Sequence, residues 1–320
     1  SSDLGLLGGG MLFMPNWSYA LPSGGQVVTN NGTITAGGKV MDITGSGNVA
    51  IDWNSFNIAA DEIVNFKNMQ AVLNYVSGGS KSEIFGKLNG AGVNVFLVNP
   101  NGILFGKTAQ VNVGQLTAST RSLEKAALNS FNGSLSPLDA GGAANVKADI
   151  INLGKLKAGK LVLEGNNLSI IGADSLEVAD KSKITLRAGE NINIGYEVTD
   201  KTTIDVGDGK RNTHQVSDYG KGGGDKASDV LSTASVTDLK GSAKSINDAM
   251  LVHDVYELQA IDRNTGTING SSYVVGNYML TGDIDAGDTK NWNSGRGFDP
   301  IGRLNRTGNG VTGSFSGAFD

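Results

Sequence analysis

The chain has 320 residues with 47 glycines, no cysteine, 6% aromatic residues and a formal net charge of −5. The lack of cysteine excludes disulfides, thiolate metal sites and cysteine nucleophiles. Because the balance is acidic and no basic cluster stands out, nothing indicates nucleic-acid or anionic-membrane binding. Glycine is roughly twice as frequent as usual but has no three-residue period, which excludes a collagen-like chain. Its spread among Val, Ile, Asn and Thr predicts many short strands with frequent turns.

The first 20 residues have the pattern of a processed leader. Two apolar stretches, 4–7 and 11–14, precede residues 18–20, which fit the small-residue pattern before a signal-peptidase site. No basic segment precedes them. We therefore interpret residues 1–20 as a signal-peptide remnant or an added sequence, with the mature chain starting near Leu21. No run of 18 apolar residues predicts a transmembrane helix.

Period-two alternation, interrupted by Gly, Asn and Asp, extends from Gln26 to about Tyr196. Residues 154–172 form one unit of 19 residues, and residues 174–195 repeat its pattern. A unit of this length cannot bury its apolar face alone, so such units are expected to stack into a continuous core. We predict an all-β, right-handed parallel β-helix. A β-sandwich is the rival fold, but hairpin turns at regular spacing are not prominent. Asn residues at turns are expected to form ladders between coils.

Three segments depart from this pattern. Residues 119–138 are interpreted as an excursion from the coil, and residues 206–241 as a Gly-rich polar loop or extension. One short α-helix is predicted near 243–261, because apolar residues recur there on one face. Those residues are Ile246, Met250, Val255 and Leu258, and the possible caps are Asp238 and Ser245. The predicted parts of the chain are therefore 1–20, a β-helical domain at 21–205, the extension at 206–241, and a helix with further, truncated coils at 242–320.

Residues with catalytic potential are few. The two histidines, His214 and His253, have no catalytic motif nearby and are interpreted as surface residues. Asp283 and Asp285 would share one face of a strand, so they are weighed as paired carboxylates that bind calcium or act on a sugar. The favoured interpretation is turn formation around neighbouring glycines. No catalytic residue, cofactor or firm metal site is predicted, and the chain is not expected to be an enzyme.

The most informative stretch is a turn with the sequence Asn-Pro-Asn-Gly-Ile, between the strand-forming runs 95–98 and 104–105. Its residues are Asn99, Pro100, Asn101, Gly102 and Ile103. Pro100 presets φ for the second position of a four-residue turn, and Gly102 relieves the last position of steric restriction. These residues predict a rigid corner between two strands, without catalytic chemistry.

This turn and an earlier motif resemble the N-terminal domain of two-partner-secretion exoproteins, the filamentous-haemagglutinin-like proteins of Gram-negative bacteria. The residues of the earlier motif are Trp53, Ser55, Phe56 and Asn57. The resemblance is strong over about 21–200 and weaker through 278–302, and it is nearest to the high-molecular-weight adhesin type of Haemophilus. A second family motif, Asn-Pro-Asn-Leu, is absent. This departure concerns the haemagglutinin subtype and not membership of the family.

The resemblance implies a β-helix whose N-terminal strands cap the first coil. It implies that the domain is recognised by the POTRA domains of a TpsB-type outer-membrane β-barrel transporter, that residues 99–103 are needed for export, and that the domain nucleates β-helix folding during export. The chain is then expected to pass through the periplasm to the cell surface or exterior.

The whole protein is expected to be a surface adhesin or a toxin carrier, with a host-cell glycan or protein as a further partner. Neither nucleic-acid binding nor membrane insertion is expected, and the domain is expected to be a monomer. The alternative is a β-helical carbohydrate-active enzyme or glycan-binding module.

Overall fold

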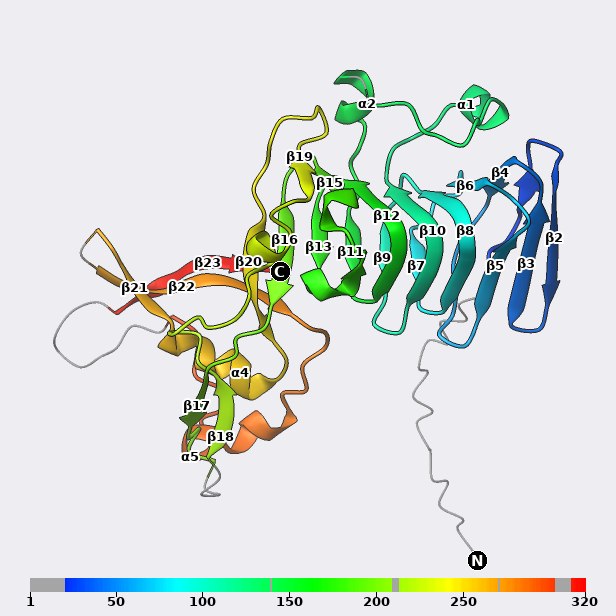
Figure 1. The fold of residues 1–320 in the computed structure, drawn as a ribbon. Helices are drawn as coiled ribbons and strands as arrows, with labels where there is room; N and C mark the ends of the chain where they lie inside the picture. The colour runs from blue at the N-terminus through cyan, green and yellow to red at the C-terminus, as the bar shows by residue number, and fades with distance from the viewer. Residues whose placement is uncertain (1–20, 139, 209–212, 270, 303–311) are drawn as a thin grey trace, which may run out of the picture.

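The computed structural model describes residues 21–138, 140–208, 213–269, 271–302 and 312–320. The described chain is mostly β, with strands stacked along one axis and a smaller unit at the end of the stack (Figure 1). The leader predicted at residues 1–20 lies outside the described residues.

The first sheet contains 12 strands. They are β1 (Gln26–Val27), β2 (Gly32–Gly37), β3 (Val40–Gly45), β4 (Asn48–Trp53), β5 (Ile63–Lys67), β6 (Ala71–Val76), β8 (Lys87–Val98), β10 (Gln110–Ser119), β12 (Lys155–Gly165), β14 (Leu176–Glu177), β15 (Ile184–Ala188) and β19 (Ser235–Thr237). Pairing is parallel except where β1 meets β4 and β2 meets β3. Val49, Val72 and Val95 occupy matching positions in successive strands. One coil therefore takes 23 residues here, more than the predicted unit.

The second sheet contains 9 strands and runs beside the first. They are β7 (Ser82–Ile84), β9 (Ile103–Phe105), β11 (Ile150–Asn152), β13 (Leu168–Ile170), β16 (Ile192–Tyr196), β20 (Asn247–Val252), β21 (Thr265–Ile268), β22 (Ser271–Leu280) and β23 (Thr312–Phe319). From β6 to β13 the chain alternates between the two sheets. Buried Val, Ile and Leu side chains from both sheets form one continuous core, and its burial is the main term that stabilises a stack of coils.

Asparagine ladders connect neighbouring coils at their turns. The backbone N–H and side-chain amide of Asn167 both donate to Asp149 Oδ1, at 2.9 and 3.0 Å. The same two groups of Asn191 donate to Asn167 Oδ1, at 3.1 and 3.2 Å. The predicted structural role of Asn at turns is confirmed at these positions.

An excursion of about 30 residues separates β10 from β11 and contains α1 (Lys125–Asn129) and α2 (Ala140–Ala144). Both helices lie on the same side of the stack (Figure 1). Leu128 and Phe131 pack on apolar side chains at the outer face of the first sheet, with Phe131 edge-on to Phe96 at a centroid distance of 5.3 Å. Thr120 Oγ1 donates to Ala148 O at 2.8 Å, which ties the two ends of the excursion together.

The helix predicted near 243–261 is wrong in its first half. Residues 247–252 form β20, which pairs with β16 on one side and β22 on the other. Residues 249–252 are all buried, so the strand lacks the alternation by which strands are recognised. The helix α4 (Val255–Ala260) begins later, where Asp254 accepts hydrogen bonds from the backbone N–H groups of Tyr256 and Glu257. The predicted cap Asp238 instead accepts from Lys240 and Ser242 in a turn, and Ser245 lies before β20.

The stretch 206–241, predicted as a loop or extension, is more ordered than its composition indicates. It contains β18 (His214–Ser217), which pairs antiparallel with β17 (Lys201–Ile204), then α3 (Ala227–Val230) and β19. Val216 and Tyr219 are buried, and β19 joins the first sheet through β15. A few apolar residues among many glycines were enough to form these elements.

The C-terminal unit comprises the described residues of 198–222, 254–264 and 281–302. It has its own apolar core, which includes Tyr219 and Trp292 and adjoins Tyr196 and Tyr278 at the end of the stack. It also contains α5 (Trp292–Gly295). The 3₁₀ helices of the described chain are η1 (Ala173–Ser175), η2 (Lys181–Lys183), η3 (Ile261–Arg263) and η4 (Gly287–Asn291).

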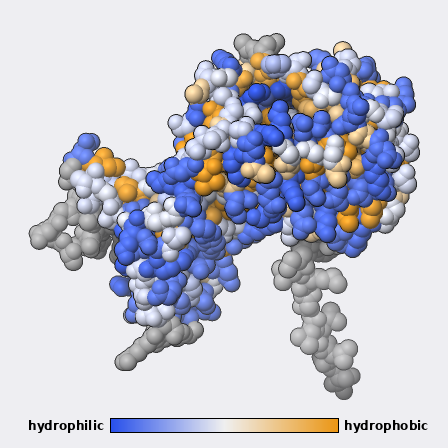
Figure 2. Space-filling view, viewed as in Figure 1, coloured by the Kyte–Doolittle hydropathy of each residue, from blue (hydrophilic) through white to orange (hydrophobic). Residues whose placement is uncertain are grey.

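The face seen in Figure 2 is mainly hydrophilic, with scattered apolar groups. Exposed large apolar residues are distributed over the chain: Val40, Ile151, Val230, Ile268 and Phe319. Among the described residues, no helix combines the length and the apolar character needed to cross a membrane.

Candidate functional site

The turn from Asn99 to Ile103 joins β8 of the first sheet to β9 of the second. The backbone N–H of Gly102 donates to the carbonyl oxygen of Asn99 at 3.1 Å and closes the turn. Gly102 has φ of +111°, a conformation that favours glycine. A Cβ atom at this position would also lie 3.3 Å from Asp149 O. The corner predicted between two strands is therefore present, and it depends on Gly102.

Asn99 is fully buried and uses both ends of its side-chain amide. Its Nδ2 donates to Ser80 O and to Ser82 Oγ, each at 3.0 Å. Its Oδ1 accepts from the backbone N–H of Asn101 at 2.9 Å. Leaving a buried amide without hydrogen-bond partners costs about 1–3 kcal/mol of folding free energy. Asn99 therefore stabilises the interior of the turn and is not available as a surface group.

Asn101 occupies the opposite position, on the surface. Its Nδ2 donates to Gly78 O at 2.7 Å and to Asn99 Oδ1 at 3.2 Å. Pro100 is half-buried, while Ile103 is buried in the core. The part of the motif that a partner could touch is thus limited to Pro100 and Asn101.

The earlier motif lies two coils before this turn, at the end of β4. Trp53 is buried; its indole N–H donates to Asn74 Oδ1 at 3.1 Å, and its ring is edge-on to Phe56 at 5.6 Å. Asn57 Oδ1 accepts from the backbone N–H of Glu83 at 2.9 Å. Ser55 Oγ lies 2.8 Å from Ser23 Oγ, which connects this coil to the segment before β1.

The structure brings the two motifs to one corner of successive coils, with residues 77–84 between them. On one side the backbone N–H of Ser77 donates to Trp53 O at 3.0 Å, beside the contact of Asn57 with Glu83. On the other side the same segment accepts the side chains of Asn99 and Asn101. We call residues 53–58, 77–84 and 99–103 the motif corner.

The serine and glycine acceptors of the motif corner were not found from sequence. Gly78, Ser80 and Ser82 carry no side chain that indicates chemistry, and two of them contribute only a carbonyl oxygen. The signal that could have found them is the repeat itself, because Gly78 precedes Asn101 by the 23 residues of one coil.

The motif corner continues into the next coils. The backbone N–H of Asn99 donates to Ser119 O at 3.0 Å, and Ser119 Oγ donates to the buried Glu164 at 2.7 Å. Arg121 Nε and Nη2 each lie 2.8 Å from the Glu164 carboxylate, and Arg121 Nη1 donates to Ser136 O in the excursion at 2.6 Å. The buried Glu164 carboxylate is thus held by both Ser119 and Arg121, and these contacts connect the motif corner to the next coils.

The carboxylates weighed for metal or sugar chemistry do not form a site. Asp283 and Asp285 follow β22 rather than lying on a strand, which contradicts the expected strand face. Asp285 Oδ1 accepts from the backbone N–H of Gly287 at 2.8 Å, as in an ordinary turn. Within the part of the chain that the structure describes, no group of three or more His, Asp or Glu side chains could hold a metal ion.

The two histidines differ from each other. His214 is half-buried, not on the surface as predicted, and stacks on Tyr256 at a centroid distance of 3.8 Å. His253 is exposed, as predicted, but each of its ring nitrogens lies within 3.0 Å of a carboxylate oxygen. It precedes α4 instead of lying on a helix.

The TPS secretion domain family matches residues 18–272, a range that contains the whole motif corner. The chain belongs to this family. The resemblance seen in the sequence is thereby confirmed, and this family of secretion domains is generally non-enzymatic.

Among curated proteins, the chain is similar to a heme/hemopexin-binding protein of Haemophilus influenzae, with 33% identity over 177 residues, 53% of this chain and 19% of that protein. It is also similar to halomucin of Haloquadratum walsbyi, with 27% identity over 215 residues, 67% of this chain and 2% of halomucin. The chain thus spans about a fifth or less of the length of these relatives. A solved structure, the HMW1 secretion domain from Haemophilus influenzae, is 20% identical with a TM-score of 0.39, covering 72% of this chain and 62% of that one.

Proposed function

We propose that this TPS secretion domain directs the export of a larger exoprotein, and that a TpsB-type outer-membrane transporter recognises it through its POTRA domains. The family match over residues 18–272 carries this proposal. Proteins with this domain are secreted across the Gram-negative envelope, so the route is through the periplasm to the cell surface or exterior.

We infer that the stacked strands are coils of a right-handed parallel β-helix, with β1 and the β2–β3 hairpin as its N-terminal cap. The support is the parallel register of successive coils, which gives way to antiparallel pairing where the stack begins. Gly25 lies so close to the Trp53 ring that a Cβ atom would be 2.4 Å from it. The segment before β1 therefore packs directly over the first coil and covers its apolar end.

In this proposal the motif corner makes coil formation cooperative during export. Asn99 fastens its coil to the previous one through Ser80 and Ser82, and to the next through Ser119 O. Each coil that stacks outside the membrane buries apolar area worth about 25 cal/mol per Å², which biases translocation forward without ATP. Before folding, exposed strand segments could pair with POTRA strands by β-augmentation.

For the whole protein we propose a role as a monomeric surface adhesin that binds a host-cell glycan or protein. Binding of heme and hemopexin is what the name of one relative states of that relative. A carbohydrate-active enzyme is not favoured, because Asp283 and Asp285 lie in a turn region after β22, where Asp285 Oδ1 accepts from the backbone N–H of Gly287.

Export of Asn99→Ala and Asn101→Ala variants tests the proposal. Each chain is co-expressed with its transporter, and the secreted and surface-displayed fractions are measured. The matched control is Asn132→Ala, an exposed asparagine that also precedes a glycine but lies in the excursion. We expect both corner variants to lose export while the control keeps it. Normal secretion of both would remove the proposed role of the motif, and normal secretion of Asn101→Ala alone would exclude a necessary contact through this side chain.

A further inference from the structure

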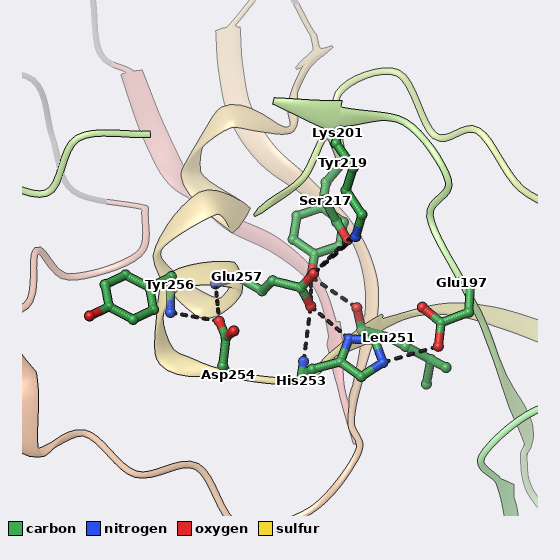
Figure 3. Close-up of polar contacts among 9 residues, drawn as sticks. All are labelled: Glu197, Lys201, Ser217, Tyr219, Leu251, His253, Asp254, Tyr256 and Glu257. Atoms are coloured by element: carbon green, nitrogen blue, oxygen red, sulfur yellow. Dashed lines mark hydrogen bonds and ion pairs between the residues drawn. The ribbon is translucent and has the colours of Figure 1, made fainter. Parts of the chain in front are cut away.

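A buried carboxylate lies at the junction between the stacked strands and the C-terminal unit. Glu257, in the first turn of α4, is only 6% exposed. It accepts hydrogen bonds from Ser217 Oγ at 2.7 Å and from the backbone N–H of His253 at 3.0 Å. Lys201 Nζ lies 3.4 Å away. Figure 3 shows these groups converging on Glu257 from the β17–β18 hairpin and from the residues before α4.

The imidazole of His253 lies between two carboxylates (Figure 3). Its Nδ1 is 2.8 Å from Glu257 Oε2, and its Nε2 is 3.0 Å from Glu197 Oε1. A neutral imidazole has a single N–H group and can donate to only one of them, whereas the imidazolium donates to both. The geometry therefore fits the doubly protonated ring.

Glu197 and Glu257 belong to different parts of the molecule. Glu197 directly follows β16, a strand of the stacked core, and Glu257 lies on α4 of the C-terminal unit. His253 directly follows β20, which pairs with β16. The imidazolium thus connects the end of the stack to the C-terminal unit at the point where the chain leaves the stack.

We propose that His253 is a proton-operated clasp, which joins Glu197 to Glu257 when doubly protonated and releases Glu197 when it loses a proton. Glu257 keeps its contact because it is buried and water cannot replace the imidazole there, whereas Glu197 is 60% exposed and can be hydrated. This device goes beyond the proposed role in export.

Histidine is the side chain whose ordinary pKa lies near neutrality, so His253 is the group of this cluster that is expected to change charge there. The groups that face the clasp are Glu197 after β16, Lys201 on β17, Tyr219 after β18, and Asp254 and Glu257 at α4. Burial acts to raise the pKa of Glu257, but hydrogen bonds from His253 and Ser217 outweigh it and lower that pKa to about 2. Burial also raises the pKa of Tyr219 well above its usual range. Neither group changes charge between pH 5 and 9.

The sign of the pH effect follows from the same contacts. The hydrogen bond to Glu257 raises the pKa of His253, against the opposing effect of burial, and the charge of Glu197 raises it further. A histidine whose folded pKa exceeds its unfolded value of about 6.5 stabilises the folded state fully below that value. The stabilisation is lost as the pH rises through the folded pKa.

Imidazole NMR tests the clasp directly, because the chain has only two histidines and His214→Gln assigns the signals. At pH 6 we expect both nitrogens of His253 to be protonated and its titration midpoint to lie above 6.5. Glu197→Gln, at an exposed site, should lower that midpoint. The matched control Glu190→Gln, in the exposed turn between β15 and β16, should not. A neutral ring at pH 6, or a midpoint that Glu197→Gln leaves unchanged, would overturn the proposal.

Amide hydrogen exchange tests the mechanical consequence. After correction for the intrinsic rate, residues 197–204 and 214–219 should open about two- to fivefold more often above the titration midpoint than below it, the size expected for one partly exposed ion pair. Glu197→Gln should abolish this step, and Glu190→Gln should keep it. Equal protection of the wild-type chain on both sides of the midpoint would show that His253 titrates without acting as a clasp.

Discussion

The motif corner and the His253 clasp both hold a junction through a buried polar side chain, but with different chemistry. Asn99 is neutral and is held by peptide and hydroxyl groups. Glu257 is charged and is held by an imidazolium, an ammonium and a hydroxyl. A neutral network has the same strength at every pH at which the chain folds, whereas a charged network changes with its proton count. The motif corner therefore contributes the same stability at every pH at which the chain folds, whereas the contribution of the His253 clasp depends on pH.

The largest expected effect is that of Glu257→Ala on the C-terminal unit. The substitution leaves Ser217 and the backbone N–H of His253 without their buried acceptor, and it should reduce the free energy of unfolding by about 3 kcal/mol. Urea unfolding followed by near-ultraviolet circular dichroism measures it, because Tyr219 and Trp292 lie in this core. Glu257→Gln retains an acceptor and should cost less. A loss below about 1 kcal/mol for Glu257→Ala would show that the cluster adds little to stability.

Acid should weaken the charged region before the neutral one. Glu257 has a folded pKa of about 2 against an ordinary value of 4.5. Its stabilisation is therefore complete above pH 4.5 and is lost as the pH falls toward 2. After correction for the intrinsic exchange rate at each pH, the increase in amide hydrogen exchange from pH 6 to pH 3 should be larger around α4 than around Asn99. Equal acceleration in both regions would remove the contrast between them.

Asn99→Ala should reduce the free energy of unfolding of the stacked strands by about 2 kcal/mol, because Ser82 Oγ and the backbone N–H of Asn101 lose their partner inside the protein. The loss should be equal at pH 5.5 and pH 8.5. Chemical denaturation at the two pH values provides the measurement. Asn132→Ala serves as the control and should change stability by less than about 0.5 kcal/mol. A loss that varies with pH would show that the corner is coupled to a titrating group.

Gly102→Ala should cost about 1 kcal/mol, since alanine is strained at φ of +111°. Its Cβ would also approach Asp149 O to 3.3 Å. The expected result is a lower melting temperature with an otherwise native circular dichroism spectrum. An unchanged melting temperature would mean that the turn relaxes to another conformation without cost.

The smallest expected effect is that of Asn101→Ala, about 0.5 kcal/mol, because its amide is exposed and water can replace Gly78 O. Set beside Asn99→Ala in the same denaturation series, this variant shows whether stability depends on the buried Asn99 more than on the exposed Asn101, for which a contact with the transporter is proposed. If the two variants destabilise equally, the inside–outside division of the corner is wrong.

The features that could be predicted from the sequence are those set by residues close together in the chain. The alternating strands and the turn closed by Gly102 follow from patterns within a few residues, and the asparagine ladders were expected in general form from the recurrence of Asn at turns. The strand β20 could not be recognised, because its last four residues are buried and thus show no alternation. Its apolar residues also matched a helical spacing by coincidence.

Contacts that depend on coil register were out of reach. Ser82 lies 17 residues before Asn99, and Glu197 lies 56 residues before His253. Neither pairing has a local signal, because both arise from stacking that places distant residues side by side. The family resemblance pointed to the turn at 99–103 but not to its partners.

The excursion between β10 and β11 is an insertion that does not disturb the stacked strands. Since Thr120 and Ala148 close its base with one hydrogen bond, and β10 and β12 keep full parallel register across the gap, the length of the inserted segment is uncoupled from the pitch of the stack. Doubling a loop costs only about 0.6 kcal/mol in closure entropy. A foreign peptide or a reporter can therefore be inserted into the excursion while the coils on either side keep their register.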